Sequence, residues 1–441
     1  MTSELFSPLP LRSGQILRNR IAKAAMEENM AGDGQLPERR LLTLYRRWAA
    51  GGTGLLITGN VMVHAEALTG PGGVVLDEHA PLEPFAEWAE AGKSGGGAVW
   101  MQINHPGRQV ASDMPGVVWG PSDVAVDLGR HSGRFGRPTA MTAQQIEDTV
   151  ARFAVTAGRA EQAGFDGVEI HAAHGYLLSQ FLSPLVNRRT DRWGGSLENR
   201  ARMLLDVVRA VRAAVSPSFA VAVKLNSADF QRGGFEADDA RQVIELLAPL
   251  GVDLVELSGG SYESPAMSGR PAEGLKPGGR PAEGQKPGGR PTESRGTGAR
   301  PADDRTRARE AYFLDLAEDL VKTSPLPLML TGGITRRATA ERVLDSGVAV
   351  VGMGTALAVT PDLPDRWRSD REAERQLAPV TWSDKTLAAA AGMAQVRHQM
   401  RRLARGSEPR PGTHPAIALV SEYRKQRVAL RGYRAWLSTS R

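Results

Sequence analysis

The chain has no cysteine among its 441 residues. Disulfides, thiolate zinc sites, cysteine-ligated iron–sulfur clusters and cysteine nucleophiles are therefore excluded. A chain without disulfides is compatible with a reducing compartment. A chain of this length buries a large core, so it needs neither a disulfide nor a structural metal to be stable.

Long apolar runs are also missing. No segment approaches the roughly 18 consecutive apolar residues that a transmembrane helix requires. The first residues, MTSELFSPLPLRSGQ, lack the basic and apolar regions of a secretory signal peptide. We therefore expect a soluble, cytoplasmic protein with no membrane partner.

Acidic residues are scarce near the end of the chain. Residues 395–441 hold eleven Lys or Arg and two acids, Glu408 and Glu422, whereas the whole chain has a net charge of +6. The positive net charge of the chain therefore comes from its C-terminal tail. One interpretation is a nucleic-acid-binding tail. We favour a pair of amphipathic helices that packs on the body of the protein or on a second copy, so we expect no nucleic-acid partner and leave a homo-oligomer open.

A dinucleotide-binding GxGxxG loop is absent after the first predicted strand, which argues against a doubly wound open sheet. Eight short apolar runs instead alternate with helical patterns, and such runs are typical of parallel strands that are buried on both faces. They span residues 20–26, 52–60, 98–105, 165–172, 219–227, 252–260, 327–333 and 348–354. The fold class predicted is α/β, a (β/α)₈ TIM barrel over residues 1–375, followed by a basic helical extension over 376–441.

Two segments interrupt this alternation. Residues 105–142, between strands three and four, form a connection far longer than the usual 4–6 or so residues, as binding loops often do. Residues 269–304 are a tandem ten-residue repeat rich in Gly, Pro and charge, with almost nothing apolar to bury. We expect a disordered insertion over 267–305, with no catalytic role.

Polar side chains gather where the predicted strands end, which is the face on which barrel enzymes build their sites. The fourth strand runs into His171, His174 and Tyr176. A metal site is one interpretation, with His105 or Glu169 as a third ligand, but there is no HExxH pattern. A second interpretation is that both histidines are structural and have their hydrogen bonds satisfied within the core. A pair of imidazole donors for one substrate oxygen, with Tyr176 as the proton donor, explains the group best, and we predict no metal.

Three further strand ends suggest a bound anion or heterocycle. Lys224 interrupts an apolar strand, so it meets either a cofactor anion or a carboxylate, Glu169 or Glu256, on a neighbouring strand. The side-chain amide of Gln102 could form hydrogen bonds with the edge of a flat heterocyclic ring. Strands seven and eight end in glycines, which form either a phosphate site or tight turns. These glycines are Gly332, Gly333 and Gly354.

Residues 169–203, EIHAAHGYLLSQFLSPLVNRRTDRWGGSLENRARM, resemble the central signature of the old yellow enzyme family of flavin-dependent ene-reductases. The match continues in LRNRIAKAAM (17–26), MQINHPGRQ (101–109), VKLNSADF (223–230), GGITRRATAERVLDSG (332–347) and VGMGTAL (351–357). It extends from residue 5 to about residue 365, apart from the repeat.

The resemblance implies non-covalent FMN across the mouth of the barrel and NAD(P)H as co-substrate in a ping-pong cycle. His171 and His174 would hold the substrate oxygen, and Tyr176 would protonate the α-carbon of an α,β-unsaturated carbonyl compound. The residues expected to bind FMN are Ala24, Ala25, Met26, Gly59, Gln102, Lys224, Gly332, Gly333, Gly354 and Thr355. The alternative substrates are nitro compounds or quinones. The alternative reaction is the oxidative removal of small groups.

Two departures from the family pattern affect the predicted site. Glu27 stands where Thr or Cys usually contacts the flavin, and a carboxylate there would make the flavin harder to reduce unless it turns away or is protonated. Thr355 replaces the Arg that usually follows the phosphate-binding Gly354. Arg336 and Arg337 are candidates for the missing positive contact.

Overall fold

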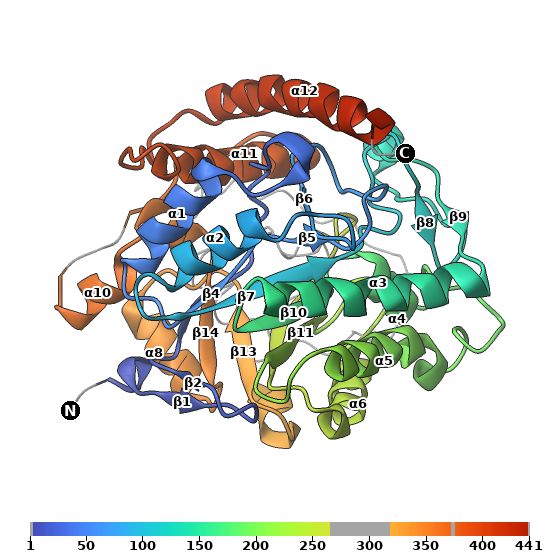
Figure 1. The fold of residues 1–441 in the computed structure, drawn as a ribbon, viewed down its shortest axis with the longest axis horizontal. Coiled ribbons are helices and arrows are strands. Elements are labelled where there is room, and N and C mark those ends of the chain that lie inside the picture. Colours follow the sequence, from blue (N-terminus) through green and yellow to red (C-terminus); the bar gives the residue numbers. More distant parts are fainter. Residues whose placement is uncertain (1–2, 265–317, 372–374, 440–441) are drawn as a thin grey trace, which may run out of the picture.

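The computed structural model describes residues 3–264, 318–371 and 375–439. Eight parallel strands form its centre (Figure 1). In chain order they are β3 (Ile21–Lys23), β4 (Leu55–Ile57), β7 (Ala98–Asn104), β10 (Gly167–Ala172), β11 (Ala220–Asn226), β12 (Leu254–Ser258), β13 (Leu328–Thr331) and β14 (Val350–Met353). Each pairs with the next, and β14 pairs with β3, so the sheet closes on itself. The predicted eight-stranded α/β barrel is confirmed.

Helices surround the barrel between successive strands. They are α1 (Arg39–Ala49), α2 (Glu83–Lys93), α3 (Ala143–Gln162), α4 (Leu177–Leu182), α5 (Leu197–Ala214), α6 (Ala237–Leu247), α8 (Arg337–Asp345), α9 (Thr355–Val359) and α10 (Leu363–Arg368). Thr142 caps α3 with a reciprocal capping box, and the Ser196 side chain caps α5.

The strands bury two different sets of side chains because successive residues point to opposite faces. Outward residues such as Val168 and Ile170 pack on the helices in the main core. Inward residues such as Ala22 and Trp100 form a second apolar layer with the N-terminal hairpin of β1 (Leu9–Pro10) and β2 (Ile16–Leu17). This layer fills the barrel at the N-terminal ends of the strands, so the opposite end is left for polar groups.

The long connection after β7 contains no α-helix. It includes β8 (Trp119–Gly120), the 3₁₀ helix η3 (Gly129–Arg134) and β9 (Thr139–Ala140). Two more short strands, β5 (Val61–Met62) and β6 (Val74–Val75), follow β4, and β5 pairs with β7. The repeat over 269–304 and the whole of the predicted insertion 267–305 lie outside the described residues.

The C-terminal extension folds over the mouth of the barrel. Its helices α11 (Lys385–Leu403) and α12 (Pro415–Thr439) lie together on the side opposite the β1–β2 hairpin (Figure 1). The Tyr433 hydroxyl donates to the Ala65 carbonyl oxygen at 2.8 Å, and Arg434 donates to the Asp113 carbonyl oxygen at 2.7 Å. The extension therefore contacts the loops that follow β4 and β7.

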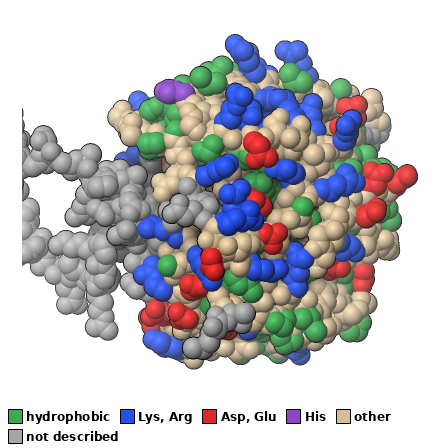
Figure 2. Space-filling model, turned by 90° about the vertical axis from the view of Figure 1, so that its left-hand side faces the viewer, with side chains coloured by type: hydrophobic (Ala, Val, Ile, Leu, Met, Phe, Trp, Pro, Cys, Tyr) green, Lys and Arg blue, Asp and Glu red, His purple; other side chains and the backbone are tan. Residues whose placement is uncertain are grey.

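The outer face of the extension mixes positive and apolar side chains. Lys and Arg stand beside hydrophobic residues along the upper edge of the space-filling view (Figure 2), the edge that carries α12 in Figure 1. Ile417, Val420, Tyr423 and Val428 are 52–67% exposed there. Within the described part of the chain, no helix is both long and apolar enough to span a bilayer.

Candidate active site

Polar side chains meet inside the barrel toward the C-terminal ends of four adjacent strands. The strand register places Gln102 on β7 beside Glu169 on β10, and His171 on β10 beside Lys224 on β11. Lys224 in turn lies beside Glu256 on β12. These residues alternate with apolar ones in sequence, so each points inward. The closed sheet thereby brings together residues that are more than 150 positions apart.

His171 and His174 stand at the end of β10 with different hydrogen bonds. The backbone N–H of Ala173 donates to His171 Nδ1 at 3.2 Å, which leaves the His171 proton on Nε2. His174 has a left-handed φ of 60°, and its backbone N–H donates to Asn226 Oδ1 at 3.0 Å. Its Nε2 lies 2.7 Å from Ser258 Oγ. Neighbouring strands thus hold the backbone and the ring of His174 in place.

Both imidazoles are neutral. Burial, with the charge of Lys224 as a smaller cause, lowers the pKa of His174 to about 3. Burial and the neighbouring His174 lower the pKa of His171 well below its ordinary value. A neutral imidazole keeps one N–H donor, so this pair can hydrogen-bond to an oxygen without carrying a positive charge.

Tyr176 completes the group that the sequence predicted. Its ring lies edge-on to His171, with 4.8 Å between ring centroids, and the His174 ring lies 5.2 Å from His171. The turn at His174 and Gly175, both with positive φ, leads directly to Tyr176, the N-cap residue of α4. The structure therefore brings all three predicted catalytic residues together.

Sequence reasoning missed a second tyrosine. The hydroxyl of Tyr262, in the loop after β12, lies 3.1 Å from the Tyr176 hydroxyl. Burial raises the pKa of Tyr262 to about 12, and burial and the neighbouring Tyr262 raise the pKa of Tyr176 well above its ordinary value. Both phenols are thus protonated at neutral pH. The available signal was a polar residue just beyond a strand end, the same signal that identified the histidines.

Lys224 forms the ion pair that the sequence left as one of two alternatives. Its Nζ donates to Glu256 Oε1, and both side chains are buried. Burial opposes ionisation of Glu256, but the Lys224 ammonium outweighs it and lowers the pKa of that carboxyl. One of the three N–H donors of Lys224 is thereby used, and two remain.

Glu169 is the neutral member of this buried group. Gln102 Nε2 donates to Glu169 Oε2 at 2.6 Å. Burial and the nearby charge of Glu256 raise the pKa of Glu169 well above its ordinary value. Glu169 Oε1 and Glu256 Oε2 have no other partner among the described residues. A proton held by Glu169 and shared with Glu256 satisfies both oxygens, since two adjacent buried carboxylates cannot both ionise.

The metal hypothesis gains no support from these contacts. Glu169 is held by Gln102, and His174 is held by Ser258. Across residues 3–264, 318–371 and 375–439, no group of three or more His, Asp or Glu side chains has the arrangement of a metal site.

The residues after β3 lie at the mouth of the barrel. Ala24 is buried, whereas Ala25 and Met26 are half-buried. The backbone N–H of Gly59 donates to Glu28 Oε1 at 3.1 Å. A Cβ on Gly59 would stand 2.5 Å from the Met26 carbonyl oxygen, so only glycine fits there. The chain ends of β3 and β4 are thus packed directly against each other.

The predicted phosphate residues follow β13 and β14, which are adjacent strands. Gly332 and Gly333 have φ values of 152° and 67°, a backbone conformation that favours glycine. Gly354 is half-buried beside Met26, and Thr355 and Gly333 are exposed. The structure therefore places these residues together at an accessible rim of the mouth.

Arg337 is not available for the role that the sequence suggested. Its guanidinium bonds to Glu341 at 2.9 Å, to the Trp367 carbonyl oxygen at 2.8 Å, and to Asp370. These partners lie on α8 and at the end of α10, and they hold the Arg337 side chain at the outer surface. The Arg337 guanidinium, one of the two candidates for the positive contact, is therefore engaged with other partners in this structure.

Glu27, the departure that the sequence left unexplained, is neutralised by the C-terminal extension. Arg397 on α11 forms an ion pair with Glu27 and donates to its backbone carbonyl oxygen at 3.2 Å. Arg397 also lies 3.4 Å from Glu422 on α12, which pairs with Arg401. The two cations and two carboxylates alternate, so little net charge remains beside the site.

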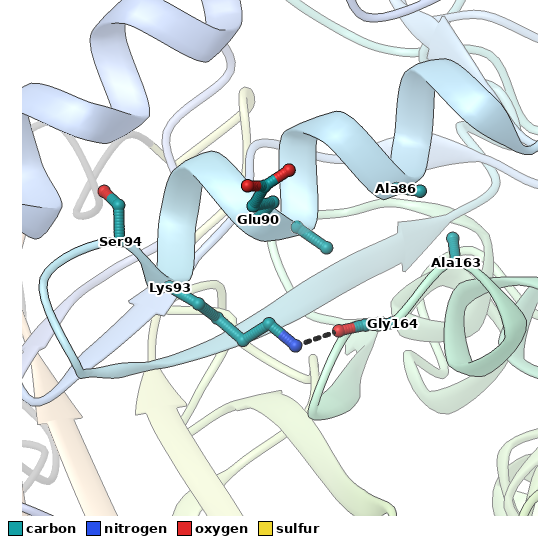
Figure 3. A pocket seen from close by; sticks show the side chains of 7 residues that line it. Ala86, Glu90, Lys93, Ser94, Ala163 and Gly164 are labelled. Carbon is teal, nitrogen blue, oxygen red and sulfur yellow. Dashed lines mark hydrogen bonds between the residues drawn. The ribbon is translucent and has the colours of Figure 1, made fainter.

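A hollow of about 440 Å³ lies between the C-terminal ends of α2 and α3. Figure 3 shows the side chains that line it. Lys93 points across it and donates to the Gly164 carbonyl oxygen at 2.5 Å. Lys93 also lies 3.6 Å from Asp166. The hollow is on the outside of the barrel, at the N-terminal ends of the strands, and none of the residues predicted to be functional lines it.

A model of the NADH:flavin oxidoreductase / NADH oxidase family matches residues 4–270. The chain belongs to this family. The NADH-dependent flavin oxidoreductase iliE of Hypocrea jecorina is 35% identical over 375 residues, which cover 81% of this chain and 87% of that protein. The NADH-dependent flavin oxidoreductase nadA of Aspergillus parasiticus is 34% identical over 77% of this chain and 72% of its own length.

The solved structure of an old yellow enzyme homologue from Zymomonas mobilis has the same fold. Its TM-score is 0.65 at 24% identity, over 85% of this chain and 94% of that one. The resemblance to the old yellow enzyme family and the assignment to the flavin oxidoreductases, an enzyme class, are confirmed.

Buried neutral histidines should make this flavin oxidoreductase lose stability in acid. Burial lowers the pKa of His64 to about 4 from its ordinary value of 6.5, and its ring packs on those of His105 and Trp119. The unfolded chain therefore binds more protons from about pH 6.5 down to pH 4, and stability falls as the pH drops through this window. At pH 5.5, the depressed pKa of His64 should lower the free energy of unfolding by about 1 kcal/mol.

Urea unfolding at pH 7.5 and pH 5.5 tests this expectation. His64→Gln should narrow the difference between the two midpoints, whereas His79→Gln, at a side chain that is 84% exposed, should leave it unchanged. An unaltered pH dependence in the His64 variant would contradict the assignment.

The ion pair between Glu27 and Arg397 gives a second expectation. Both side chains are largely buried, at 16% and 11% exposure. Arg397→Met should destabilise the oxidoreductase by about 3 kcal/mol, because it leaves a carboxylate without its cation. Glu27→Gln in the same protein should recover part of that loss. Thermal unfolding of the two single variants and the double variant measures the coupling, and simply additive losses would show that the pair does not interact.

Proposed function

We propose that the protein is an FMN-dependent NAD(P)H oxidoreductase that reduces the C=C bond of α,β-unsaturated carbonyl compounds. The observation that carries this proposal is the convergence of two neutral imidazoles and a protonated phenol at one end of β10. Such a group can hold a carbonyl oxygen and deliver a proton to the same molecule. The names of the similar fungal proteins favour NADH as the electron donor.

The residues at the mouth of the barrel suit FMN. Gln102 retains its carbonyl oxygen and one N–H for the pyrimidine edge of the ring, and Lys224 retains two N–H donors for the electron-rich N1 and O2 side. The buried carboxamide of Asn104, two positions along β7 on the same face, has no partner among the described residues. An unsatisfied buried amide at this point supports a polar ligand inside the barrel.

The rim residues would hold the rest of the cofactor. Gly332, Gly333, Gly354 and Thr355 offer accessible backbone N–H groups and one hydroxyl, a set that suits a phosphate without a guanidinium. Ala24, Ala25, Met26 and Gly59 would line the ring at the ends of β3 and β4. When bound, FMN supplies the electron pair that reduces the double bond.

The protein side of the reaction has two parts. His171, through its Nε2–H, and His174 would hold the substrate oxygen and stabilise the negative charge that develops on it. Tyr176 would protonate the α-carbon. NAD(P)H and substrate would occupy this place in turn, as in a ping-pong cycle. Lys224, which is paired with Glu256, would place a positive charge beside the bound flavin.

Reconstitution with FMN and stopped-flow absorbance test the proposal. The protein should bind FMN, lose flavin absorbance on mixing with NADH or NADPH, and regain it on mixing with 2-cyclohexenone. A colourless protein that takes up no FMN would overturn the proposal. Reoxidation by nitro compounds or quinones but not by enones would replace the substrate class, and formaldehyde release from a methylated amine would indicate the oxidative alternative.

Variants of the donor group separate binding from chemistry. His171→Ala combined with His174→Ala should slow reoxidation by the enone about 10²–10³-fold, since donors to the developing oxyanion are lost. Tyr176→Phe should slow it about 10²-fold or more through loss of the acid. Flavin reduction by NAD(P)H should fall less in both. Equal losses in the two half-reactions would contradict the assigned roles.

A further inference from the structure

Tyr176 is enclosed, which raises the question of how it regains a proton. Its side chain is only 5% exposed. Among the described residues, its hydroxyl has one hydrogen-bond partner, the hydroxyl of Tyr262 at 3.1 Å. Tyr262 is half-buried, so it is the more accessible of the two tyrosines. A phenol that gives away a proton once per cycle needs a route by which another proton arrives.

The loop that carries Tyr262 is held in place. The backbone N–H of Gly260 donates to the Ala228 carbonyl oxygen at 3.2 Å, and that of Ser261 donates to the Ser264 carbonyl oxygen at 3.0 Å. The Tyr262 ring also stacks on Phe135 from the long connection after β7, with 5.8 Å between centroids. A hydrogen bond within the loop and contacts with two other segments therefore hold Tyr262 against Tyr176.

Opposite charges act on both phenols at once. Glu27 raises the pKa of Tyr176 and of Tyr262, and Arg397 lowers the pKa of each. The ion pair between these residues joins the tyrosine pair to the C-terminal extension. Arg397 thus offsets the Glu27 charge, and a hydrogen bond donated from Tyr262 would stabilise a phenolate formed on Tyr176.

We propose that Tyr262 is a proton relay that restores the phenol of Tyr176 after each turnover, an inference that rests on the function proposed above. Tyr176 gives its proton to the α-carbon and becomes a phenolate. The O–H bond of Tyr262 then breaks as a new O–H bond forms on Tyr176, and Tyr262 takes a proton from solvent water. One solvent proton is consumed for each C=C bond reduced, and both tyrosines end the cycle neutral.

Hydroxyl exchange measured by NMR tests the relay without any turnover. The chain has six tyrosines, so labelling at the ¹³Cζ position gives few signals, and Tyr176→Phe and Tyr262→Phe assign two of them. In an equal mixture of H₂O and D₂O, a fast-exchanging hydroxyl gives one averaged line and a slow one gives two. Tyr176 should give one line in the wild-type protein and two in Tyr262→Phe. If Tyr176 gives two lines in the wild-type protein, its hydroxyl exchanges slowly and the proposal is overturned.

Kinetics distinguish a relay from a structural role. In Tyr262→Phe, a single reoxidation of the reduced enzyme by 2-cyclohexenone should stay within about threefold of wild type, because Tyr176 starts protonated. Steady-state turnover with the enone should fall at least tenfold. Turnover with ferricyanide, which needs no proton from Tyr176, should not change. Equal losses in the single and repeated turnovers, or steady-state turnover within twofold of wild type, would overturn the relay.

Tyr433→Phe is the matched control. It removes a buried tyrosine hydroxyl from the C-terminal extension, where that hydroxyl bonds to Ala65 and not to Tyr176. This variant should leave both the Tyr176 line and enone turnover as in wild type. If the wild-type protein reduces no enone, the proposed function fails, whereas the NMR result still decides whether Tyr262 connects Tyr176 to solvent.

Discussion

Alternation of side chains along strands that close into a ring is the constraint on which the rest of the structure depends. Every second residue of each strand must lie inside the barrel, whatever its chemistry. At the N-terminal ends these inward residues are apolar, as with Ala22 and Trp100. At the C-terminal ends they are polar, as with Gln102, His171 and Lys224. The same geometry that seals one end of the barrel therefore concentrates hydrogen-bonding groups at the other.

Concentrating charge in a buried place requires compensation, and the protein provides it within the barrel wall. Lys224 is paired with Glu256, and Glu169 remains protonated beside them. This arrangement keeps one fixed positive charge beneath the mouth while avoiding two adjacent carboxylates. The histidines also avoid an unpaired buried charge, because burial keeps both imidazoles neutral.

The C-terminal extension continues this compensation outside the barrel. The acid that departs from the family pattern, Glu27, would be unfavourable beside a flavin if it were alone. Arg397 approaches from α11 and pairs with it, and Glu422 on α12 holds Arg397 in turn. Contacts with the barrel therefore account for part of the excess of basic residues in the tail. Its exposed apolar residues on α12 have no assigned role.

The sequence by itself determined the features that depend on near neighbours. Apolar runs located all eight strands, and polar residues at a strand end identified His171, His174 and Tyr176. The side chains that cap α3 and α5, Thr142 and Ser196, likewise stand directly before their helices in the sequence. The tertiary structure alone decided between Glu169 and Glu256 as the partner of Lys224, found Tyr262 beside Tyr176, and brought Arg397 to Glu27 across 370 positions. The physical reason is that periodicity and capping act within a few residues, whereas pairs across strands and between the tail and the barrel exist only once the sheet has closed.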